Sequence, residues 1–300
     1  MRPAAWEALA RVRSRSVGPP LDPDLRVTLN FHPDRLSRGR TVLEHLRLDG
    51  TYRSQFETGT SNGGLTAHEG GARWRWERDI FGGAYDDAPA AERPVYGALD
   101  HRRGPLGGAP RFGSAYLRLT PEVLGRTSFC FPDSVFGPGL FGTADACDLV
   151  RHAEEYARRV RDGVDEADEA REGGLLDAYV EAHVHGRVEL ARDVEVLALD
   201  PCYRGTEIEE QARALPVSVR WHEGRRLTVQ EAERHVAFRG PEAVELARRI
   251  ARHGELDARV IGLAAAAGAD GQLLKRVWHL VARYGRPRGL TDPWAGPSRG

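Results

Sequence analysis

Lysine, long apolar runs and an excess of charge are what this sequence lacks. Lys275 is the only lysine among 300 residues, so arginine supplies nearly all of the 43 basic side chains, which balance 44 acidic ones to a net charge of −1. A near-neutral chain offers no block of positive charge to a polyanion, so nucleic-acid binding is not indicated. A phosphate or carboxylate in a binding site would therefore be held by arginine or by backbone N–H groups.

Cysteine is also scarce. Cys130, Cys147 and Cys202 are odd in number and far apart, which excludes a disulfide framework and a cysteine zinc knot. No stretch approaches ~20 consecutive apolar residues, and the N-terminus lacks the apolar core of a signal peptide. We therefore expect a cytoplasmic protein without a membrane partner. Its 41% hydrophobic and 29% charged residues are typical of a globular chain with room for one large domain and an appendage.

Glycine and aromatic residues are concentrated in one third of the chain. Residues 50–143 contain 17 of the 34 glycines and 13 of the 23 Phe, Trp and Tyr residues. Glycine permits tight turns and close backbone approach, and aromatic rings form rigid walls. This composition is typical of strands and long loops around a cleft, and equally of a β-rich core with many turns.

Periodic patterns flank this stretch. Apolar and polar side chains alternate over residues 27–32 and 179–185, which predicts two strands that each have one core face and one polar face. We expect a third strand at 194–199, a helix from Ser37 to Leu48 and an amphipathic helix over 149–167. After residue 205 the pattern is helical, with helices expected over 207–215, 229–238, 241–253, 260–267 and 273–284.

These elements predict an α+β fold with a β-sheet core and a helical C-terminal region. Residues 1–20 would be an N-terminal helix or arm, residues 21–205 a mixed α+β domain of catalytic type, and residues 206–300 the helical region. Helices of this length are marginal without tertiary contacts, so packing of this region on the core is an open alternative to independent folding. Its surface is a candidate site for a protein partner.

The polar faces of the two alternating strands hold the strongest candidates for chemistry. Glu181 shares its face with His183, while the opposite face is apolar, so its carboxylate is expected to point into a cleft. His32 lies on the polar face of the first strand, and Arg35 follows the turn at Pro33, where it could hold a pyrophosphate. The alternatives are an edge-strand ion pair for Glu181, a structural role for His32 and a surface ion pair for Arg35.

The segment Gln55-Phe-Glu-Thr-Gly-Thr-Ser-Asn-Gly-Gly64 has the composition of a loop that presents backbone N–H groups to a ligand. It contains no Walker lysine and no G-x-G-x-x-G, which excludes a P-loop or a Rossmann site. Glu57 is either a second active-site carboxylate or a cap of the loop. Tyr96, followed by Gly97, is a candidate stacking ring, and Ser114 is a candidate for the cleft wall.

Two other interpretations remain open. A metal-dependent hydrolase would use imidazole and carboxylate ligands, and a non-catalytic module would hold a nucleotide or a peptide in the cleft. The possible metal ligands are His32, Asp34, Glu57, Glu181, His183 and His185.

Several of these segments together resemble the bacterial family called domain of unknown function 3626, over about residues 25–205. The resemblance is carried by Asn30-Phe-His-Pro-Asp-Arg35, Tyr52-Arg-Ser-Gln-Phe-Glu-Thr-Gly-Thr-Ser-Asn-Gly-Gly64, Arg93-Pro-Val-Tyr-Gly-Ala-Leu99, Arg111-Phe-Gly-Ser-Ala-Tyr116 with the segment from Arg126 to Ser134, and Val180-Glu-Ala-His-Val-His-Gly186. The family name implies no activity. More distantly, the same order of segments resembles the ADP-ribosyltransferase fold, whose members bind NAD in a cleft between two antiparallel sheets and break its nicotinamide–ribose bond. This resemblance implies an α+β fold with a split antiparallel β-sheet core.

That resemblance implies NAD as the substrate, with ADP-ribose transferred to an unknown acceptor or to water. Cleavage of an N-glycosidic bond passes through an oxocarbenium-like state, which requires a carboxylate near the ribose. Glu181 would supply it, and His32 would contact the ribose. The late strand contains Glu-Ala-His and not Glu-x-Glu, so arginine is the least supported acceptor. The residues expected to bind the dinucleotide are Arg35, Tyr52, Gln55, Glu57, Thr58, Ser61, Asn62, Tyr96, Ser114 and His183.

Overall fold

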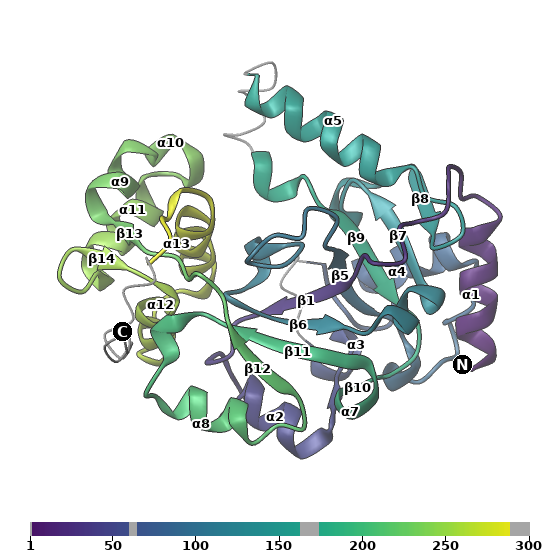
Figure 1. The fold of residues 1–300 in the computed structure, drawn as a ribbon, viewed down its shortest axis with the longest axis horizontal. Coiled ribbons are helices and arrows are strands. Elements are labelled where there is room, and N and C mark those ends of the chain that lie inside the picture. Colours follow the sequence, from purple (N-terminus) through teal and green to yellow (C-terminus); the bar gives the residue numbers. More distant parts are fainter. Residues whose placement is uncertain (1, 60–64, 163–173, 289–300) are drawn as a thin grey trace, which may run out of the picture.

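Eight strands form one sheet through the centre of the protein (Figure 1). The computed structural model describes residues 2–59, 65–162 and 174–288. Neighbouring strands are antiparallel, except for the parallel pair β11 and β12. The predicted combination of helices with a mostly antiparallel sheet is confirmed. The order is β12 (Ser218–Trp221), β11 (Val194–Leu199), β6 (Ala115–Leu119), β1 (Val27–Phe31), β5 (Val95–Leu99), β9 (Val180–Val184), β7 (Thr127–Phe131) and β8 (Leu140–Thr143).

The sheet opens between its two central strands, β1 and β5. β1 pairs with β5 only through Val27 and Thr28, whereas residues 28–31 all pair with β6. β5 in turn pairs with β9 along its whole length. Gly97 is the first residue of β5 beyond the pairs with β1, and a Cβ atom there would lie 2.6 Å from the carbonyl oxygen of Thr28, so the close approach of β1 requires a glycine. The expected split is therefore a divergence of two halves within one hydrogen-bonded sheet.

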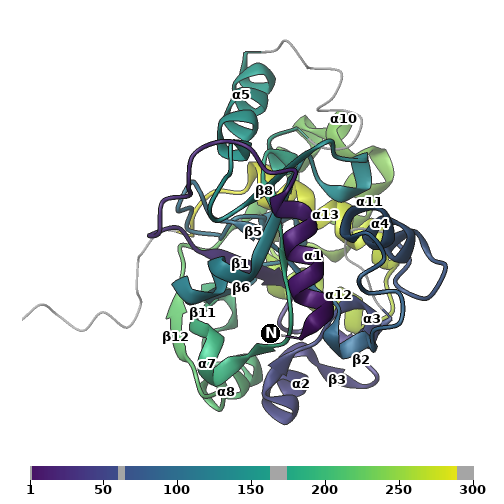
Figure 2. The same ribbon diagram turned by 90° about the vertical axis from the view of Figure 1, so that its right-hand side faces the viewer.

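Helices cover both faces of the half that contains β9, β7 and β8. α1 (Pro3–Arg13) packs on α4 (Ala72–Phe81), β7 and β8, and Figure 2 shows α1 and α4 close together. α5 (Leu149–Arg161) packs on β7, β8 and β9. Cys130 of β7 belongs to the apolar cluster with α1 and α4, and its neighbour Phe129 to the cluster with α5, so the two layers lie on opposite faces.

Short elements surround the remaining strands. The helices are α2 (Val42–Asp49), α3 (Gln55–Thr58), α7 (Leu190–Asp193) and α8 (Glu207–Arg213), of which α2 packs on α8. Three two-stranded sheets are formed by β2 (Leu36–Ser37) with β3 (Arg40–Thr41), β4 (Thr51–Tyr52) with β10 (Val188–Glu189), and β13 (Leu227–Thr228) with β14 (Glu255–Leu256).

The C-terminal helices lie together beside the sheet (Figure 1). They are α9 (Val229–Arg234), α10 (Val236–Arg239), α11 (Pro241–Ile250), α12 (Ala258–Ala266) and α13 (Gly271–Tyr284). Their apolar residues belong to the same hydrophobic core as β1. Trp278 of α13 is fully buried and donates its indole N–H to the carbonyl of Pro110 at 2.8 Å. The helical region therefore packs directly on the loops next to β1.

The strands expected at 27–32, 179–185 and 194–199 are confirmed as β1, β9 and β11, whereas the helix expected from Ser37 to Leu48 begins only at Val42. The preceding residues form the hairpin β2–β3, whose turn places Arg38 and Gly39 at positive φ angles of 51° and 79°. Thr41 then caps α2 in a capping box with Glu44. The helix expected over 149–167 ends at Arg161, and residues 163–173 lie outside the described part.

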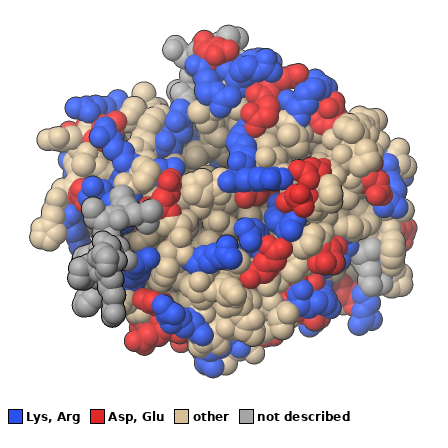
Figure 3. Space-filling model, in the orientation of Figure 1, with Lys and Arg blue, Asp and Glu red and all other residues tan. Residues whose placement is uncertain are grey.

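Surface charge matches the composition. On the face in Figure 3, acidic and basic side chains are interspersed, as expected for a net charge of −1. Among residues 2–59, 65–162 and 174–288, no helix has the length and apolar character needed to cross a membrane.

Candidate functional site

A cavity of about 480 Å³ lies where β1 and β5 diverge. Its size is within the range of sites that bind small molecules and cofactors. Strands β1 and β5 form two of its walls, the segment from Arg35 to Thr58 forms a third, and the end near β9 presents Arg73, Asp133 and Glu181. Seven of the residues predicted from the sequence line it: His32, Arg35, Tyr52, Gln55, Thr58, Tyr96 and Glu181.

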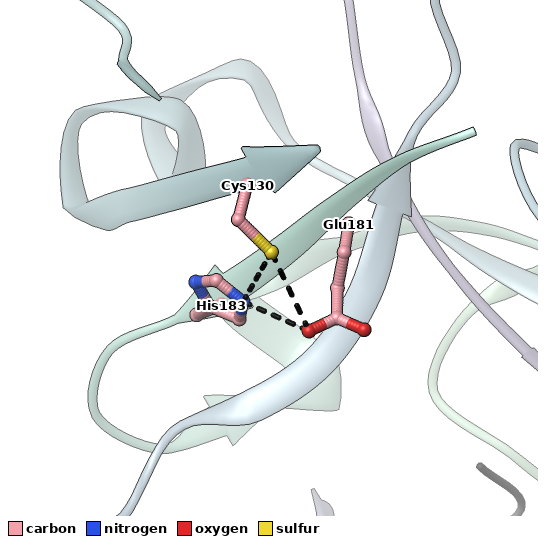
Figure 4. Close-up of side chains that lie close together, drawn as sticks. All are labelled: Cys130, Glu181 and His183. Carbon is pink, nitrogen blue, oxygen red and sulfur yellow. Dashed lines mark hydrogen bonds and ion pairs between the residues drawn. The ribbon is translucent and has the colours of Figure 1, made fainter. Parts of the chain in front are cut away.

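Glu181 is the second residue of β9, between β5 and β7, and is 4% exposed. One carboxylate oxygen, Oε2, accepts a hydrogen bond from Ser134 Oγ at 3.0 Å. The other, Oε1, lies 3.0 Å from His183 Nε2 and 3.8 Å from Arg73 Nη1. Figure 4 shows Glu181 and His183, both from β9, together with Cys130 from β7. Both oxygens are therefore held, and the orientation of the carboxylate is fixed.

Arg73 enters the cavity from α4 and is buried among carboxylates. Its Nη1 donates to Ser134 Oγ at 2.7 Å, so the same serine joins Arg73 to Glu181. Its guanidinium carbon lies 4.0 Å from the centre of the Tyr96 ring, so one face of that ring is already covered. Burial, followed by the charge of Glu181, raises the pKa of Asp133 to about 6. Arg73 is the positive charge that offsets this pair of acids.

A second charged residue of α4, Glu77, fixes the cavity wall. Glu77 is 1% exposed and accepts hydrogen bonds from Arg93 Nη1 and from Tyr96 Oη, both at 2.7 Å. Burial raises the pKa of Glu77, while its contacts with Tyr96 and Arg93 oppose that shift. Helix α4 therefore positions Tyr96 through Glu77, and Glu181 through Arg73.

His32 follows the last residue of β1, at the opposite wall. Its ring meets Trp278 edge to face, with 5.0 Å between the centroids. Burial, aided by the charge of Arg35, lowers the pKa of His32 to about 4, so the imidazole is neutral at pH 7. Burial likewise raises the pKa of Tyr52 to about 12, so its phenol keeps its proton. This wall offers neutral hydrogen-bonding groups.

Positive charge lines the wall formed by the β2–β3 hairpin and α2. Arg35, Arg38 and Arg53 line the cavity there, and Asp49, which pairs with Arg53 at 2.7 Å, is the acid among them. The cavity is therefore bipolar: at one end the two acids Glu181 and Asp133 outnumber Arg73, and at the other end the arginines outnumber the acid. A ligand that carries charges of both signs would match it.

The comparison with protein families gives two matches to one family, described as "Protein of unknown function (DUF3626)". They cover residues 26–167 and 153–284, which together include most of the chain. The chain belongs to the DUF3626 family. None of the curated proteins compared with the chain matches it. The family description carries no activity, so the function of this DUF3626 protein has to be argued from its own site.

Several residues predicted for the site lie elsewhere in this DUF3626 protein. Glu57 does not line the cavity, because it closes the capping box of α3 by accepting from the Ser54 backbone N–H at 2.8 Å. Ser114 is buried at 2% exposure but is not part of the cavity lining. His183 lies behind Glu181, completely buried. Ser61 and Asn62 fall outside the described residues.

Sequence reasoning missed Arg73, Glu77 and the link through Ser134. The available signal was the spacing of Arg73, Glu77, Ile80 and Phe81, which are the buried residues of α4 and follow a helical period. Charged residues occupy two of these four inner positions, so a search for apolar periodicity passes over them. In the DUF3626 protein Arg73 contacts Glu181 through Ser134, and Glu77 contacts Tyr96.

Two of the expected metal ligands, Glu181 and His183, lie close to a cysteine that was not among them, Cys130. Donor atoms of Cys130, Glu181 and His183 lie within 4.8 Å of one another. Burial raises the pKa of the Cys130 thiol well above its ordinary value, and Arg73 lies 3.8 Å from the same carboxylate oxygen. A thiol that keeps its proton is a poor metal ligand, and a guanidinium beside the same carboxylate oxygen competes with direct coordination of a metal ion there, so this cluster fits a metal poorly.

The other expected metal ligands are separated from that cluster by their own contacts. His185 is hydrogen-bonded to Tyr85 and Ser128. Asp34 is packed against α12, where a Cβ on Gly262 would clash with its carboxylate.

Proposed function

We propose that this protein binds NAD in the cavity between β1 and β5 and cleaves its nicotinamide–ribose bond, passing ADP-ribose to an acceptor or to water. The observation that carries the proposal is the position of Glu181. It is a carboxylate held through both oxygens, at the acidic end of a bipolar cavity where the sheet divides. The resemblance of the sequence to ADP-ribosyltransferases points to the same residue.

Charge distribution supports NAD as the ligand. The nicotinamide ring of NAD is a cation and its pyrophosphate is an anion, so the molecule is bipolar in the same sense as the cavity. Glu181 and Asp133 would face the cationic ring and its ribose, and Arg35 and Arg38 would face the pyrophosphate. A divalent anion alone, or a simple cation alone, would match only one end.

In the proposed reaction the bond between ribose C1′ and the pyridinium nitrogen breaks, and its electron pair leaves with neutral nicotinamide. Positive charge develops on the ribose, and the Glu181 carboxylate would stabilise it. The acceptor oxygen or nitrogen, or water, then bonds to C1′ and loses a proton, for which Glu181 is the candidate base. The neutral imidazole of His32 would hydrogen-bond the ribose without adding a repelling charge.

Purified protein incubated with NAD, with and without a cell extract as the source of acceptor, tests the proposal. Release of nicotinamide, measured by chromatography, is expected from the wild type. Glu181→Gln should abolish it, while Glu195→Gln, on β11 of the same sheet in an ion pair with Arg26, should not. Absence of NAD binding and turnover, or equal turnover by Glu181→Gln, would reject the proposal.

Metal-dependent hydrolysis and simple ligand binding make different predictions. A metal enzyme requires near-stoichiometric metal by elemental analysis, lost on His183→Ala, with a fall in thermal stability on chelation. A binding module would show saturation by NAD without any nicotinamide release.

A further inference from the structure

A continuous row of hydrogen bonds extends from Glu181 away from the cavity into the protein. His183 Nε2 lies 3.0 Å from Glu181 Oε1, and His183 Nδ1 lies 3.1 Å from Ser128 Oγ. Ser128 Oγ also lies 2.9 Å from His185 Nε2, and His185 Nδ1 lies 2.8 Å from Tyr85 Oη. The row thus uses both nitrogens of two histidines, and it joins β9, β7 and the segment after α4.

The chemistry of its members sets the direction of every bond in this row. A carboxylate only accepts, so His183 must donate from Nε2, and a neutral imidazole then accepts at Nδ1. Ser128 therefore donates to His183 and accepts from His185 Nε2, which leaves His185 Nδ1 to accept from the Tyr85 hydroxyl. All four hydrogens point toward Glu181. If Glu181 were protonated and donating to His183, every bond would have to reverse.

We propose that Tyr85, Ser128, His183 and His185 act as positioning residues whose polarised hydrogen-bond chain orients the Glu181 carboxylate. The inference rests on the proposed function, in which Glu181 is the reacting carboxylate. It also gives a role to the His-x-His motif, neither of whose histidines lines the cavity.

Burial makes a purely structural role a poor explanation of the row. Ser128, His183 and His185 have no exposed surface, and Tyr85 is 2% exposed. Buried polar groups add less to stability than apolar groups of the same shape would, so such a row is costly unless its hydrogen bonds are all made. Burial also lowers the pKa of each histidine to about 3, which keeps both neutral and the direction of the row intact.

Charged and titratable groups from other elements also face Glu181. Arg73 of α4, Asp133 and Ser134 after β7, and Cys130 of β7 contact it or its partners. Of these groups, Arg73 and Asp133 line the cavity and so lie on the side of the carboxylate toward it. The chain through His183 fixes the side away from it, so its loss should affect turnover and leave NAD binding in place.

Steady-state kinetics of NAD cleavage test this division. Tyr85→Phe removes one hydroxyl and keeps the ring that stacks on His185, so kcat should fall by roughly 2- to 10-fold. Ser128→Ala breaks two bonds, so kcat should fall by roughly 5- to 100-fold, with KM within about twofold of wild type. The control is His222→Gln, another buried histidine, which contacts Ser114 and Gly224 and should leave kcat unchanged. An unchanged kcat in Ser128→Ala would overturn the inference.

Nitrogen-15 NMR of histidine-labelled protein tests the chain without any turnover. Both His183 and His185 should be neutral Nε2–H tautomers at pH 7, assigned by comparison with His183→Gln and His185→Gln. Tyr85→Phe should shift the Nδ1 signal of His185, because its hydrogen bond is lost. An Nδ1–H tautomer at either residue would overturn the chain. Lack of turnover by a wild type with the expected tautomers would count against the proposed function alone.

Discussion

Replacing Arg93 by methionine should strongly destabilise the protein. The side chains of Arg93 and Glu77 are 5% and 0% exposed and are joined by a 2.7 Å ion pair. Arg93→Met fills much of the same space but leaves the carboxylate of Glu77 buried without a cation. Breaking a buried ion pair in this way costs about 3–5 kcal/mol. Arg93→Met also removes the hydrogen bond from Arg93 Nη2 to the carbonyl of Tyr85, which lowers the stability further.

The free energy of unfolding in urea, measured for Arg93→Met, Glu77→Gln and the double variant at pH 5 and pH 7.5, tests this reasoning. Burial raises the pKa of Glu77 above 4.5, so the folded state binds a proton that the unfolded state releases, and stability falls as the pH rises above 4.5. Arg93 opposes that shift. Arg93→Met should therefore lose more stability at pH 7.5 than at pH 5.

The double variant separates a charge effect from a packing effect. A neutral amide in place of the Glu77 carboxylate needs no cation, so Glu77→Gln combined with Arg93→Met should recover at least half of the stability that Arg93→Met loses at pH 7.5. The reasoning is refuted if Arg93→Met costs less than about 1 kcal/mol, or if the double variant is as unstable as the single one.

Three further substitutions test other parts of the fold. Gly113→Ala should cost about 1–3 kcal/mol or more by urea unfolding, because its Cβ would lie 2.0 Å from the backbone of Phe31; wild-type stability would contradict the close approach. Trp278→Ala should cost about 3–5 kcal/mol and remove the bond to Pro110; a loss under about 1 kcal/mol would show that α13 is not part of the core. The raised pKa of Asp133 should make the wild-type free energy of unfolding fall as the pH rises from 4 to 6. Asp133→Asn lacks this titration, so its free energy of unfolding should increase relative to that of the wild type over the same range. A difference between the two proteins that does not change with pH would contradict the raised pKa.

The central strands could be predicted because their side chains follow a simple rule. Alternation over 27–32 and 179–185 identified β1 and β9, and with them the positions of His32 and Glu181 on the cavity. The C-terminal helices followed from apolar residues at helical spacing. In each case the buried face is chemically different from the other face, which is the condition under which periodicity is informative.

The hairpin β2–β3 and helix α4 could not be predicted in the same way. In the hairpin, Arg38 takes a left-handed backbone conformation, which is uncommon for arginine and could not be predicted from the residue type. In α4, the inner face carries Arg73 and Glu77, whose hydrogen-bond partners include Ser134 and Arg93, which lie outside the helix. Whether such charged side chains can be buried depends on partners from other parts of the fold. The sequence of α4 alone does not reveal those partners.

The two buried charges on the inner face of α4 also support a functional role for this helix. Buried ion pairs add little stability over well-packed apolar residues, so an inner helix face with two charges is not explained by folding alone. Both charges lead to the cavity: Arg73 to Glu181 through Ser134, and Glu77 to Tyr96. Residues with shifted pKa values cluster at functional sites, because a fold buries polar groups there and removes them from water. Helix α4 is therefore better understood as part of the site than as part of the core.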